Sequence, residues 1–380
     1  MPTPDVDAAD LETQAGLFRV FADGMKRLPL YHRLCQAAAD DPHVVARVFL
    51  ARPDQRRINI LLAAVHDVLL AGADDPLAQW YGSVTHDPRP VHGGIDDPWP
   101  HFRRLVLEDD GVAERIATRS TQTNEVGRCA ATMPAIAQIA TEAPGAPIDG
   151  HRPVGLVEVG ASAGLNLLLD RYEYEYDPGG TVGGPSAVTL ACQVRGPVVP
   201  PVPERLPPIE TRVGLDLHPV DVGDRDQARW LVACQWPDQL DRLHRVRAAV
   251  ALARSDPPRL VQGDAVDDLA PLVEAVPTHA LPVIVTTWVM AYLTEDRQAA
   301  FLIELDRLGA ERDLTYLFAE HPSEVPGLPV PPRPDGAADD VRFSTMVRID
   351  WRDGARQPAR RLADMHPHVT WLIWQDQPTR

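Results

Sequence analysis

The stretch LVEVGASAGLNLLLD, residues 156–170, decides how the second half of the chain is interpreted. A short apolar run leads through a glycine-rich turn into apolar residues at helical spacing, which predicts a β-strand, a tight turn and a helix. Gly160, Ser162 and Gly164 fit the G-x-S-x-G pattern that presents the nucleophile of an α/β hydrolase. A glycine turn at the same place in an α/β sheet also lets a nucleotide cofactor approach the backbone. Both interpretations are open at this point.

The sequence after residue 150 alternates short β-rich runs with helical segments. After the opening strand, the β-rich runs are residues 211–217, 258–264, 281–288 and 313–321. The helical segments between them are residues 224–234, 240–255 and 295–309. This alternation predicts an α/β fold with a Rossmann-like, doubly wound and mostly parallel sheet, covered by helices on both faces.

Four other segments lie outside this alternation. Residues 341–353 and 369–375 are β-rich, and we expect them to form an antiparallel pair at the edge of the sheet. The proline-rich insertions at residues 177–208 and 321–340 have apolar residues interleaved, so we expect ordered loops or a small flap.

The first part of the chain has apolar residues at helical spacing from about residue 11 to about residue 140. Residues 58–72 are apolar on nearly all sides of a helix, which predicts burial, and His66 among them is expected to be a hydrogen-bonded core histidine. A turn-rich stretch at residues 142–153 follows. We therefore predict an N-terminal all-α domain over residues 1–150 and a Rossmann-like domain over residues 151–380.

The composition narrows the choice of partners. The chain has 54 acidic and 37 basic residues and a net charge of −17, which disfavours nucleic acid and anionic membranes and favours a small-molecule substrate. The acidic start and the lack of an apolar run of about 20 residues lead us to expect a cytoplasmic protein. The four cysteines are scattered and no metal-binding motif occurs, so we expect no metal site. The oligomeric state is left open.

A carboxylate inside the first strand separates the two interpretations of the glycine turn. Burying Glu158 costs several kcal/mol unless a cation pairs with it, and the ammonium group of a bound aminoacyl moiety would supply that cation. A hydrolase would gain nothing from this carboxylate. The hydrolase alternative uses Ser162, with Asp264 as the acid and His321 or His366 as the base.

Acidic residues also close the next two strands. Asp216 ends the second strand, where a carboxylate can accept both ribose hydroxyls, and Asp264 follows the third, suited to an adenine amino group. With Glu158, this set resembles the class I S-adenosylmethionine-dependent methyltransferases over roughly residues 154–374. The alternative for Asp216 is an Asx turn, and for Asp264 a helix cap. The resemblance implies S-adenosylmethionine as cofactor, held by Glu158, Gly160, Ser162, Gly164, Asp216, Asp264, Ala265 and Trp288.

Over nearly its full length, the chain is also similar to a bacterial family known only as a domain of unknown function. The segments that carry this similarity are NILLAAVHDVLL, RSTQTNEVGRCA, EVGASAGLNLLLDRYEYEY, RVGLDLHPVDV and MHPHVTWLIW. This similarity implies no activity, so the methyltransferase interpretation depends on the residues at the strand ends.

Candidate substrate contacts come from elsewhere in the chain. We interpret RSTQTNEVGRCA as a polar helix that forms a binding wall, with a domain-interface network as the alternative. Its candidate residues are Gln122, Asn124, Glu125 and Arg128. Tyr292 and Trp288 are expected in the adenine or acceptor pocket or in the core, and His321 as a base.

The sequence thus predicts a methyltransferase that transfers the methyl group of S-adenosylmethionine to a small molecule. The alternatives are a serine hydrolase that uses Ser162 and a protein that binds a nucleoside ligand without turnover.

Overall fold

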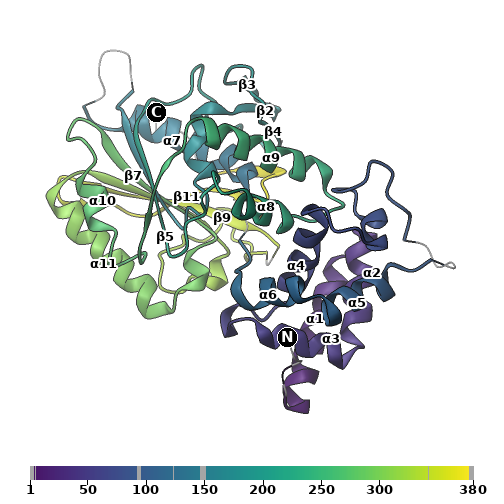
Figure 1. Cartoon of the computed structure of the whole chain (residues 1–380). Coiled ribbons are helices and arrows are strands. Elements are labelled where there is room, and N and C mark those ends of the chain that lie inside the picture. Colours follow the sequence, from purple (N-terminus) through teal and green to yellow (C-terminus); the bar gives the residue numbers. More distant parts are fainter. Residues whose placement is uncertain are drawn as a thin grey trace. The chain divides into compact units, whose positions relative to one another are not determined.

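The computed structural model describes residues 4, 6–91, 96–122, 124–145, 151–340 and 342–375. The chain forms two compact units (Figure 1). One comprises Met1–Thr123 and Gly223–Arg247, and the other comprises Asn124–Val222 and Ala248–Arg380. Residues 223–247 therefore belong with the first unit, although they follow the first strands of the second in sequence.

The first unit is built from helices around one apolar core. Its helices are α1 (Ala8–Gly24), α2 (Pro29–Ala39), α3 (Pro42–Arg47), α4 (Ile58–Leu70), α5 (Pro98–Glu108), α6 (Asp110–Thr118) and α8 (Arg225–Ala233). Helix α4 is the most deeply buried, as its apolar surroundings predict. Within it, His66 contacts the Ala233 carbonyl oxygen through Nδ1 at 2.9 Å and the Ser83 hydroxyl through Nε2 at 2.7 Å. The prediction of a satisfied core histidine is confirmed.

The second unit contains a mixed sheet in the order β3-β2-β4-β12-β11-β9-β8-β7-β1-β5-β6, with β10 paired to β9. The parallel strands that were expected from sequence are β1 (Val154–Val159), β5 (Ile209–Asp216), β6 (Arg259–Gln262), β7 (Leu281–Thr287) and β8 (Leu314–Glu320). The remaining strands are β2 (Glu173–Asp177), β3 (Gly180–Val182), β4 (Thr189–Arg195), β9 (Ser344–Arg352), β10 (Ala355–Arg356), β11 (Arg360–Met365) and β12 (Trp371–Trp374). The predicted α/β class with a large, mostly parallel sheet is confirmed.

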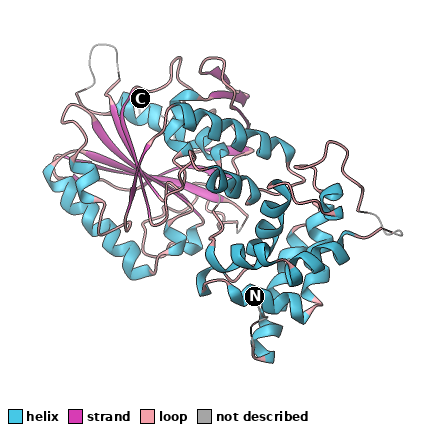
Figure 2. Ribbon diagram, viewed as in Figure 1, coloured by secondary structure: helices cyan, strands magenta, loops and turns pink. Residues whose placement is uncertain are grey.

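Helices cover both faces of the parallel strands (Figure 2). Helices α10 (Ala270–Glu274) and α11 (Glu295–Glu311) contribute to an apolar cluster with Val157 and Val159 of β1. On the opposite face, Thr132 and Ile136 of α7 (Cys129–Glu142) lie near Leu156. Strands β1, β7 and β8 are buried at every position, because parallel strands between two helical layers have no solvent-facing side. Helix α9 (Leu240–Ser255) begins in the first unit and ends in the second.

We predicted that residues 341–353 and 369–375 form an antiparallel pair at the edge of the sheet, and this prediction is wrong. Strand β11 lies between β9 and β12 and pairs antiparallel with both. Strand β12 continues on its other side into a parallel pair with β4, so neither β9 nor β12 is an edge. The sequence could not show this, because the segment between them, residues 354–368, was not recognised as strand-forming.

The first proline-rich insertion is also more regular than expected. Residues 177–208 were predicted to be loops or a flap, yet they contain β3 and β4, which extend the sheet together with β2. Strand β2 alternates buried tyrosines with exposed acids, and the hydroxyl groups of Tyr174 and Tyr176 donate to the Leu169 and Ala130 carbonyl oxygens. This alternation is typical of a strand with one face on the core.

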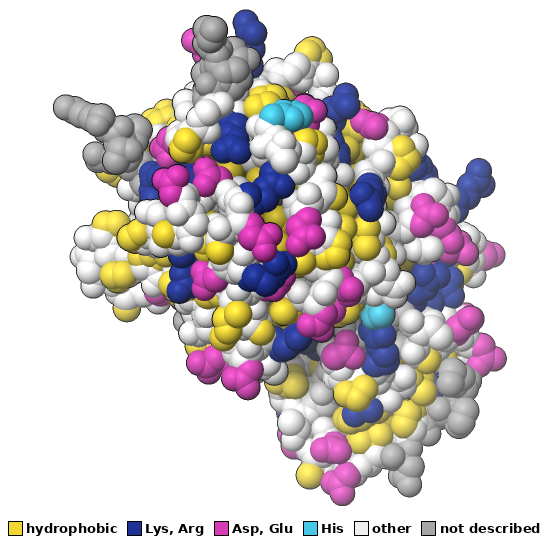
Figure 3. Space-filling view, turned by 90° about the vertical axis from the view of Figure 1, so that its left-hand side faces the viewer, with side chains coloured by type: hydrophobic (Ala, Val, Ile, Leu, Met, Phe, Trp, Pro, Cys, Tyr) yellow, Lys and Arg dark blue, Asp and Glu magenta, His cyan; other side chains and the backbone are white. Residues whose placement is uncertain are grey.

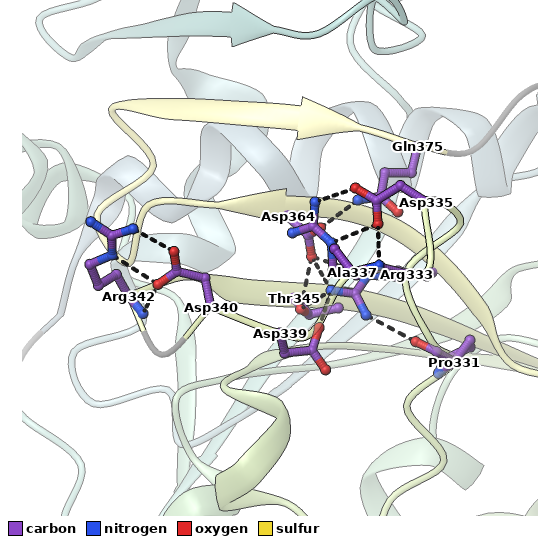
Figure 4. A network of polar contacts seen from close by, with 11 residues as sticks. Pro331, Arg333, Asp335, Ala337, Asp339, Asp340, Arg342, Thr345, Asp364 and Gln375 are labelled. Atoms are coloured by element: carbon purple, nitrogen blue, oxygen red, sulfur yellow. Dashed lines mark hydrogen bonds and ion pairs between the residues drawn. The ribbon is translucent and has the colours of Figure 1, made fainter.

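The second insertion is an ordered loop held to the sheet by buried charges (Figure 4). Arg361 of β11 donates to the Pro331 carbonyl oxygen at 3.0 Å and to the Asp339 carboxylate at 2.7 Å. Asp364, which is 0% exposed, accepts from Arg361 Nε at 3.1 Å and from the Thr345 hydroxyl at 2.9 Å. The loop therefore depends on β9 and β11 for its conformation.

Candidate functional site

The candidate site lies at the carboxyl ends of β1 and β7, where the strand order reverses. The chain runs from β1 to β5 and β6 on one side, and to β7 and β8 on the other. Neighbouring strands whose connections diverge leave a crevice at their carboxyl ends, which is where open α/β sheets bind ligands. All residues described in the following paragraphs, except Gln122, belong to the second unit.

Glu158 is the buried carboxyl group nearest the end of β1. It is 3% exposed, and its Oε1 accepts a hydrogen bond from Asn166 Nδ2 at 3.0 Å, while Oε2 is buried without a partner. Burial raises the pKa of Glu158 to about 8, although Asn166 and the positive charge of Arg128 oppose this shift. At neutral pH this group is therefore mostly a neutral carboxylic acid.

The glycine turn follows directly. Gly160, Ser162 and Gly164 have φ angles of +74°, +53° and +69°, a left-handed region that favours glycine. A Cβ at Gly160 would lie 2.3 Å from Val289 Cγ2, and one at Gly164 would lie 2.7 Å from Pro258 Cγ. Both glycines are therefore required by backbone conformation and by packing against the protein itself.

Asp216 joins the end of β5 to this turn. Its Oδ2 accepts from the Ser162 backbone N–H at 2.7 Å, and its Oδ1 accepts from the His218 N–H at 2.7 Å. The second contact is the Asx turn that was the alternative to a ribose role. Each oxygen has a second lone pair, so the carboxylate retains acceptor capacity beside the glycine turn.

Asp264 is more fully engaged. Its Oδ1 accepts from the backbone N–H groups of Val266 and Asp267 at 2.8 and 3.1 Å, and Arg297 forms an ion pair with it. It therefore caps the turn after β6, while the neighbouring Ala265 is partly buried against the apolar cluster of α10 and α11. The structure brings Glu158 and Asp216 to the glycine turn and leaves Asp264 paired with a helix.

The segment RSTQTNEVGRCA was predicted to be a helix, and this is wrong. Residues 119–122 and 124–125 are irregular, and only a 3₁₀ turn (Val126–Arg128) precedes α7. The polar side chains compete with the backbone hydrogen bonds that a helix would need. Gln122 is half-buried in the first unit.

Three side chains of this segment connect distant parts of the second unit. Asn124 Nδ2 donates to the Ala161 carbonyl oxygen of the glycine turn at 2.9 Å. Glu125 pairs with His368 at 3.0 Å, and Arg128 Nη1 donates to the Thr287 carbonyl oxygen at the end of β7 at 2.8 Å. Segments that are far apart in sequence therefore meet at the ends of β1 and β7.

A small cavity lies among these residues. It is lined by Arg128, Thr132, Glu158, Asn166 and Thr287, and by apolar side chains of α7, β1 and β7. The space open to the centre of a water molecule is about 10 Å³, room for one water-sized group. Two polar atoms of the residues that line the cavity are buried without hydrogen-bond partners: Arg128 Nε and Glu158 Oε2.

The end of β8 adds one group that the sequence analysis missed. Glu320 is 1% exposed, its Oε1 accepts from the backbone N–H groups of Val289 and Met290, and burial raises its pKa to about 7. Its Oε2 is buried without a partner. The sequence contained a signal for Glu320, because this carboxyl group stands at the end of an apolar run, much as Glu158 stands one residue before the end of its own.

His321 follows β8 and contacts Ser323 through one ring nitrogen. Its Nδ1 lies 2.7 Å from the Ser323 hydroxyl oxygen and 3.2 Å from the Ser323 backbone nitrogen. Its Nε2 is buried without a partner. Trp288, at φ +57°, donates from Nε1 to the Ser344 hydroxyl at 2.9 Å, while Tyr292 is 73% exposed.

The described residues contain no group of three or more potential metal ligands. None of the helices in the described ranges has both the length and the apolar character needed to cross a bilayer.

No curated protein matches the chain. The model of a bacterial family does match it over residues 15–374, nearly the full length, as the similarity of its segments predicted. The chain belongs to DUF2332, the family described as an uncharacterized protein conserved in bacteria.

Proposed function

We propose that this protein is an S-adenosylmethionine-dependent methyltransferase that acts on a small-molecule acceptor. The observation that carries the proposal is the set of carboxyl groups at the ends of three neighbouring parallel strands. Glu158 lies near the end of β1, Asp216 ends β5, and Asp264 follows β6. They follow one another in the order that the resemblance to class I methyltransferases implies, and Asp216 contacts the glycine turn directly.

The strand order supports the same proposal. The parallel strands β6-β5-β1-β7-β8 follow the 3-2-1-4-5 order of nucleotide-binding sheets, and antiparallel β9 lies next to β8. One difference is that β9, β11 and β12 continue as consecutive antiparallel neighbours.

The residues fit the cofactor in part. The free lone pairs of Asp216 suit the ribose hydroxyls, and the unpartnered Oε2 of Glu158, which is mostly protonated at neutral pH, suits an oxygen atom of the ligand. Asp264 would have to share its carboxylate between Arg297 and an adenine amino group. The cofactor would supply an electrophilic methyl group, and the protein would contribute mainly alignment of the acceptor.

Proton transfer needs a separate group. His321 remains a candidate base, since its Nδ1 contacts Ser323 and its buried Nε2 has no hydrogen-bond partner. Burial raises the pKa of Glu320 to about 7, so its carboxylate can accept a proton near neutral pH.

Calorimetric titration with S-adenosylmethionine and S-adenosylhomocysteine tests the proposal. We expect saturable binding to the wild type and a loss of about tenfold or more in Asp216→Ala, since hydrogen bonds to a charged group are lost. Glu210→Ala is the matched control, because this exposed carboxylate lies in the same strand at its opposite end. Asp216→Asn, which keeps an acceptor for the turn, serves if the alanine variant unfolds. Absence of saturable binding to the wild type would overturn the proposal.

One observation favours a second candidate. The positive φ of Ser162 directly after β1 is the kind of strained turn on which hydrolases present a nucleophile. Covalent labelling of Ser162 by a fluorophosphonate, absent in Ser162→Ala, would favour a serine hydrolase. Tight cofactor binding without methyl transfer to any acceptor would favour the third possibility, a non-catalytic nucleoside-binding protein.

A further inference from the structure

Arg128 is held in place without a carboxylate partner. Its Nη1 donates to the carbonyl oxygen of Thr287 at 2.8 Å and to the hydroxyl of the same residue at 3.4 Å. In the described part of the chain, no carboxylate lies within ion-pair distance of its guanidinium, and its buried Nε–H has no acceptor. By contrast, the buried Arg348 and Arg361 each pair with carboxylates.

The surroundings leave this positive charge incompletely compensated. Burial lowers the pKa of Arg128 below its ordinary value, and Glu125, Glu320, Tyr292 and Glu158 only partly oppose the effect. Of these acids, Glu125 is already paired with His368, and Glu158 is mostly protonated at neutral pH. Arg128 is half-buried and its Nε is fully buried without an acceptor, and a shielded charge without a counterion is costly, so the site has the electrostatic character of an anion-binding site.

The cavity beside Arg128 has a matching size and donor pattern. Arg128 Nε–H is one unpaired donor, and the protonated carboxyl of Glu158 supplies a second through Oε2. The space admits one water-sized group, so it suits one oxygen of a carboxylate whose remaining atoms lie outside it. A phosphoryl group has more oxygens than this space admits.

We infer that Arg128 and the cavity it shares with Glu158 form a binding site for the carboxylate of a small molecule. The guanidinium would donate from Nε–H to one carboxylate oxygen, in the geometry that makes arginine the usual carboxylate ligand. The carboxylate would belong either to the acceptor or to the aminoacyl end of the cofactor, and this assignment rests on the proposed function. The existence of the carboxylate site does not depend on the proposed function.

Acetate and acetamide are probes that differ in charge but hardly in shape. We expect acetate to raise the thermal unfolding midpoint of the wild type in a saturable manner at constant ionic strength, because it binds the folded state. Acetamide should have no saturable effect. Equal effects of the two probes would overturn the inference, as would a crystal structure from acetate solution with only a water molecule in the cavity.

Arg128→Gln tests the residue. We expect its affinity for acetate to fall by about tenfold or more, since the charged donor is lost. Arg342→Gln is the control, because the side chain of Arg342 is 78% exposed and the residue lies just after the second proline-rich insertion, residues 321–340. Acetate binding that is unchanged in Arg128→Gln would overturn the inference.

Glu158→Gln gives an independent readout that does not remove Arg128. In the wild type, acetate affinity should fall about tenfold per pH unit above pH 8, as Glu158 loses its proton and becomes an anion. The groups that interact with Glu158 are Asn166, Arg128, Asp216, Cys129 and Tyr172, and burial raises the pKa values of Cys129 and Tyr172 well above their ordinary values. The glutamine variant should bind acetate without this pH dependence. A wild type whose acetate affinity is independent of pH would contradict the role of Glu158.

Competition identifies the source of the carboxylate. S-adenosylhomocysteine carries a carboxylate, whereas 5′-methylthioadenosine does not. If the former displaces acetate and the latter does not, the carboxylate is that of the cofactor; if acetate still binds beside saturating S-adenosylhomocysteine, it is that of the acceptor. Acetate binding without any binding of either nucleoside would keep the inference and reject the proposed function.

Discussion

Glu158 and Glu320 are two buried carboxyl groups whose protonation is coupled to folding. Burial raises their pKa values to about 8 and about 7, from 4.5 in the unfolded chain. The folded protein therefore keeps protons that the unfolded chain releases. Their contribution to the free energy of unfolding is complete below pH 4.5 and is lost as the pH rises through 7 and 8.

We predict that Glu158→Gln flattens the dependence of stability on pH. The wild-type urea midpoint should fall between about pH 5 and about pH 9, and the variant's should fall less, by the equivalent of at least about 1 kcal/mol. Urea titrations followed by circular dichroism at several pH values measure this. Glu210→Gln, at the exposed amino end of β5, should follow the wild type. Parallel curves for Glu158→Gln and the wild type would show that this carboxyl is ionised in the folded state.

Gly160 allows a second prediction at the scale of one residue. In Gly160→Ala, the new Cβ would lie 2.3 Å from Val289 Cγ2 in a backbone with φ +74°, so we expect a loss of about 2 kcal/mol or more. Gly180→Ala has a φ of +92° and nothing within 4 Å of its Cβ, so it reports the backbone cost alone. Thermal unfolding of both variants measures the difference. Equal losses would mean that Val289 moves freely and that packing does not fix the turn.

Among the elements, the loop at residues 321–340 depends on strand side chains rather than on its own sequence. Asp364 of β11 is buried and accepts from Arg361 and Thr345, and Arg361 in turn holds Pro331 and Asp339. The many prolines limit the conformations of the loop, but the buried ion pair determines where it lies.

We predict that Asp364→Ala is strongly destabilising. It removes the buried one of the two carboxylates that pair with Arg361 and leaves only Asp339, whose side chain is 34% exposed, so we expect a loss of about 3 kcal/mol. Asp335→Ala removes a carboxylate from an ion pair with Arg333, but Asp335 is exposed, so we expect a much smaller loss. Urea unfolding of the two variants compares them. A small loss in Asp364→Ala would mean that water or another carboxylate replaces Asp364.

The sequence predicted elements where apolar pattern and burial coincide. The parallel strands β1, β5, β6, β7 and β8 lie within about two residues of their predicted positions, because each contains a short β-rich apolar run. Strands β3 and β10 are two or three residues long, too short for a periodic pattern. The segment before α7 was misassigned because its polar side chains bond to other strand ends, contacts that no local pattern contains.

The candidate site was predictable in part for the same reason. Glu158 was identified because a carboxyl within a buried strand is costly wherever the rest of the chain lies. The position of Arg128 at the end of β7 depends on a contact 159 residues away in sequence. No spacing rule relates these residues, so only the fold could bring them together.

At the scale of the whole molecule, acidic residues outnumber basic ones, yet the two signs are interspersed on the face shown in Figure 3. Arginines make many surface ion pairs there and elsewhere, each worth little on its own. The net charge of −17 acts at longer range and disfavours phosphate backbones. This agrees with a small molecule as the ligand, which remains a prediction.

The sheet of the second unit is closed by the last strand of the chain. Strand β12 pairs antiparallel with β11 and parallel with β4, so it joins the strands of residues 173–195 to the rest of the sheet. Trp371, Leu372 and Trp374 are all buried.

We predict that a chain ending at Thr370 is insoluble or unfolded, because the loss of β12 exposes apolar surface and leaves two open strand edges at β4 and β11. A chain ending at Gln375 retains β12 and is the control, expected to match the full-length protein in soluble yield, circular dichroism and urea midpoint. If the shorter chain were to unfold at the same urea concentration as the control, β4 and β11 would have to pair directly, and β12 would be dispensable to the fold.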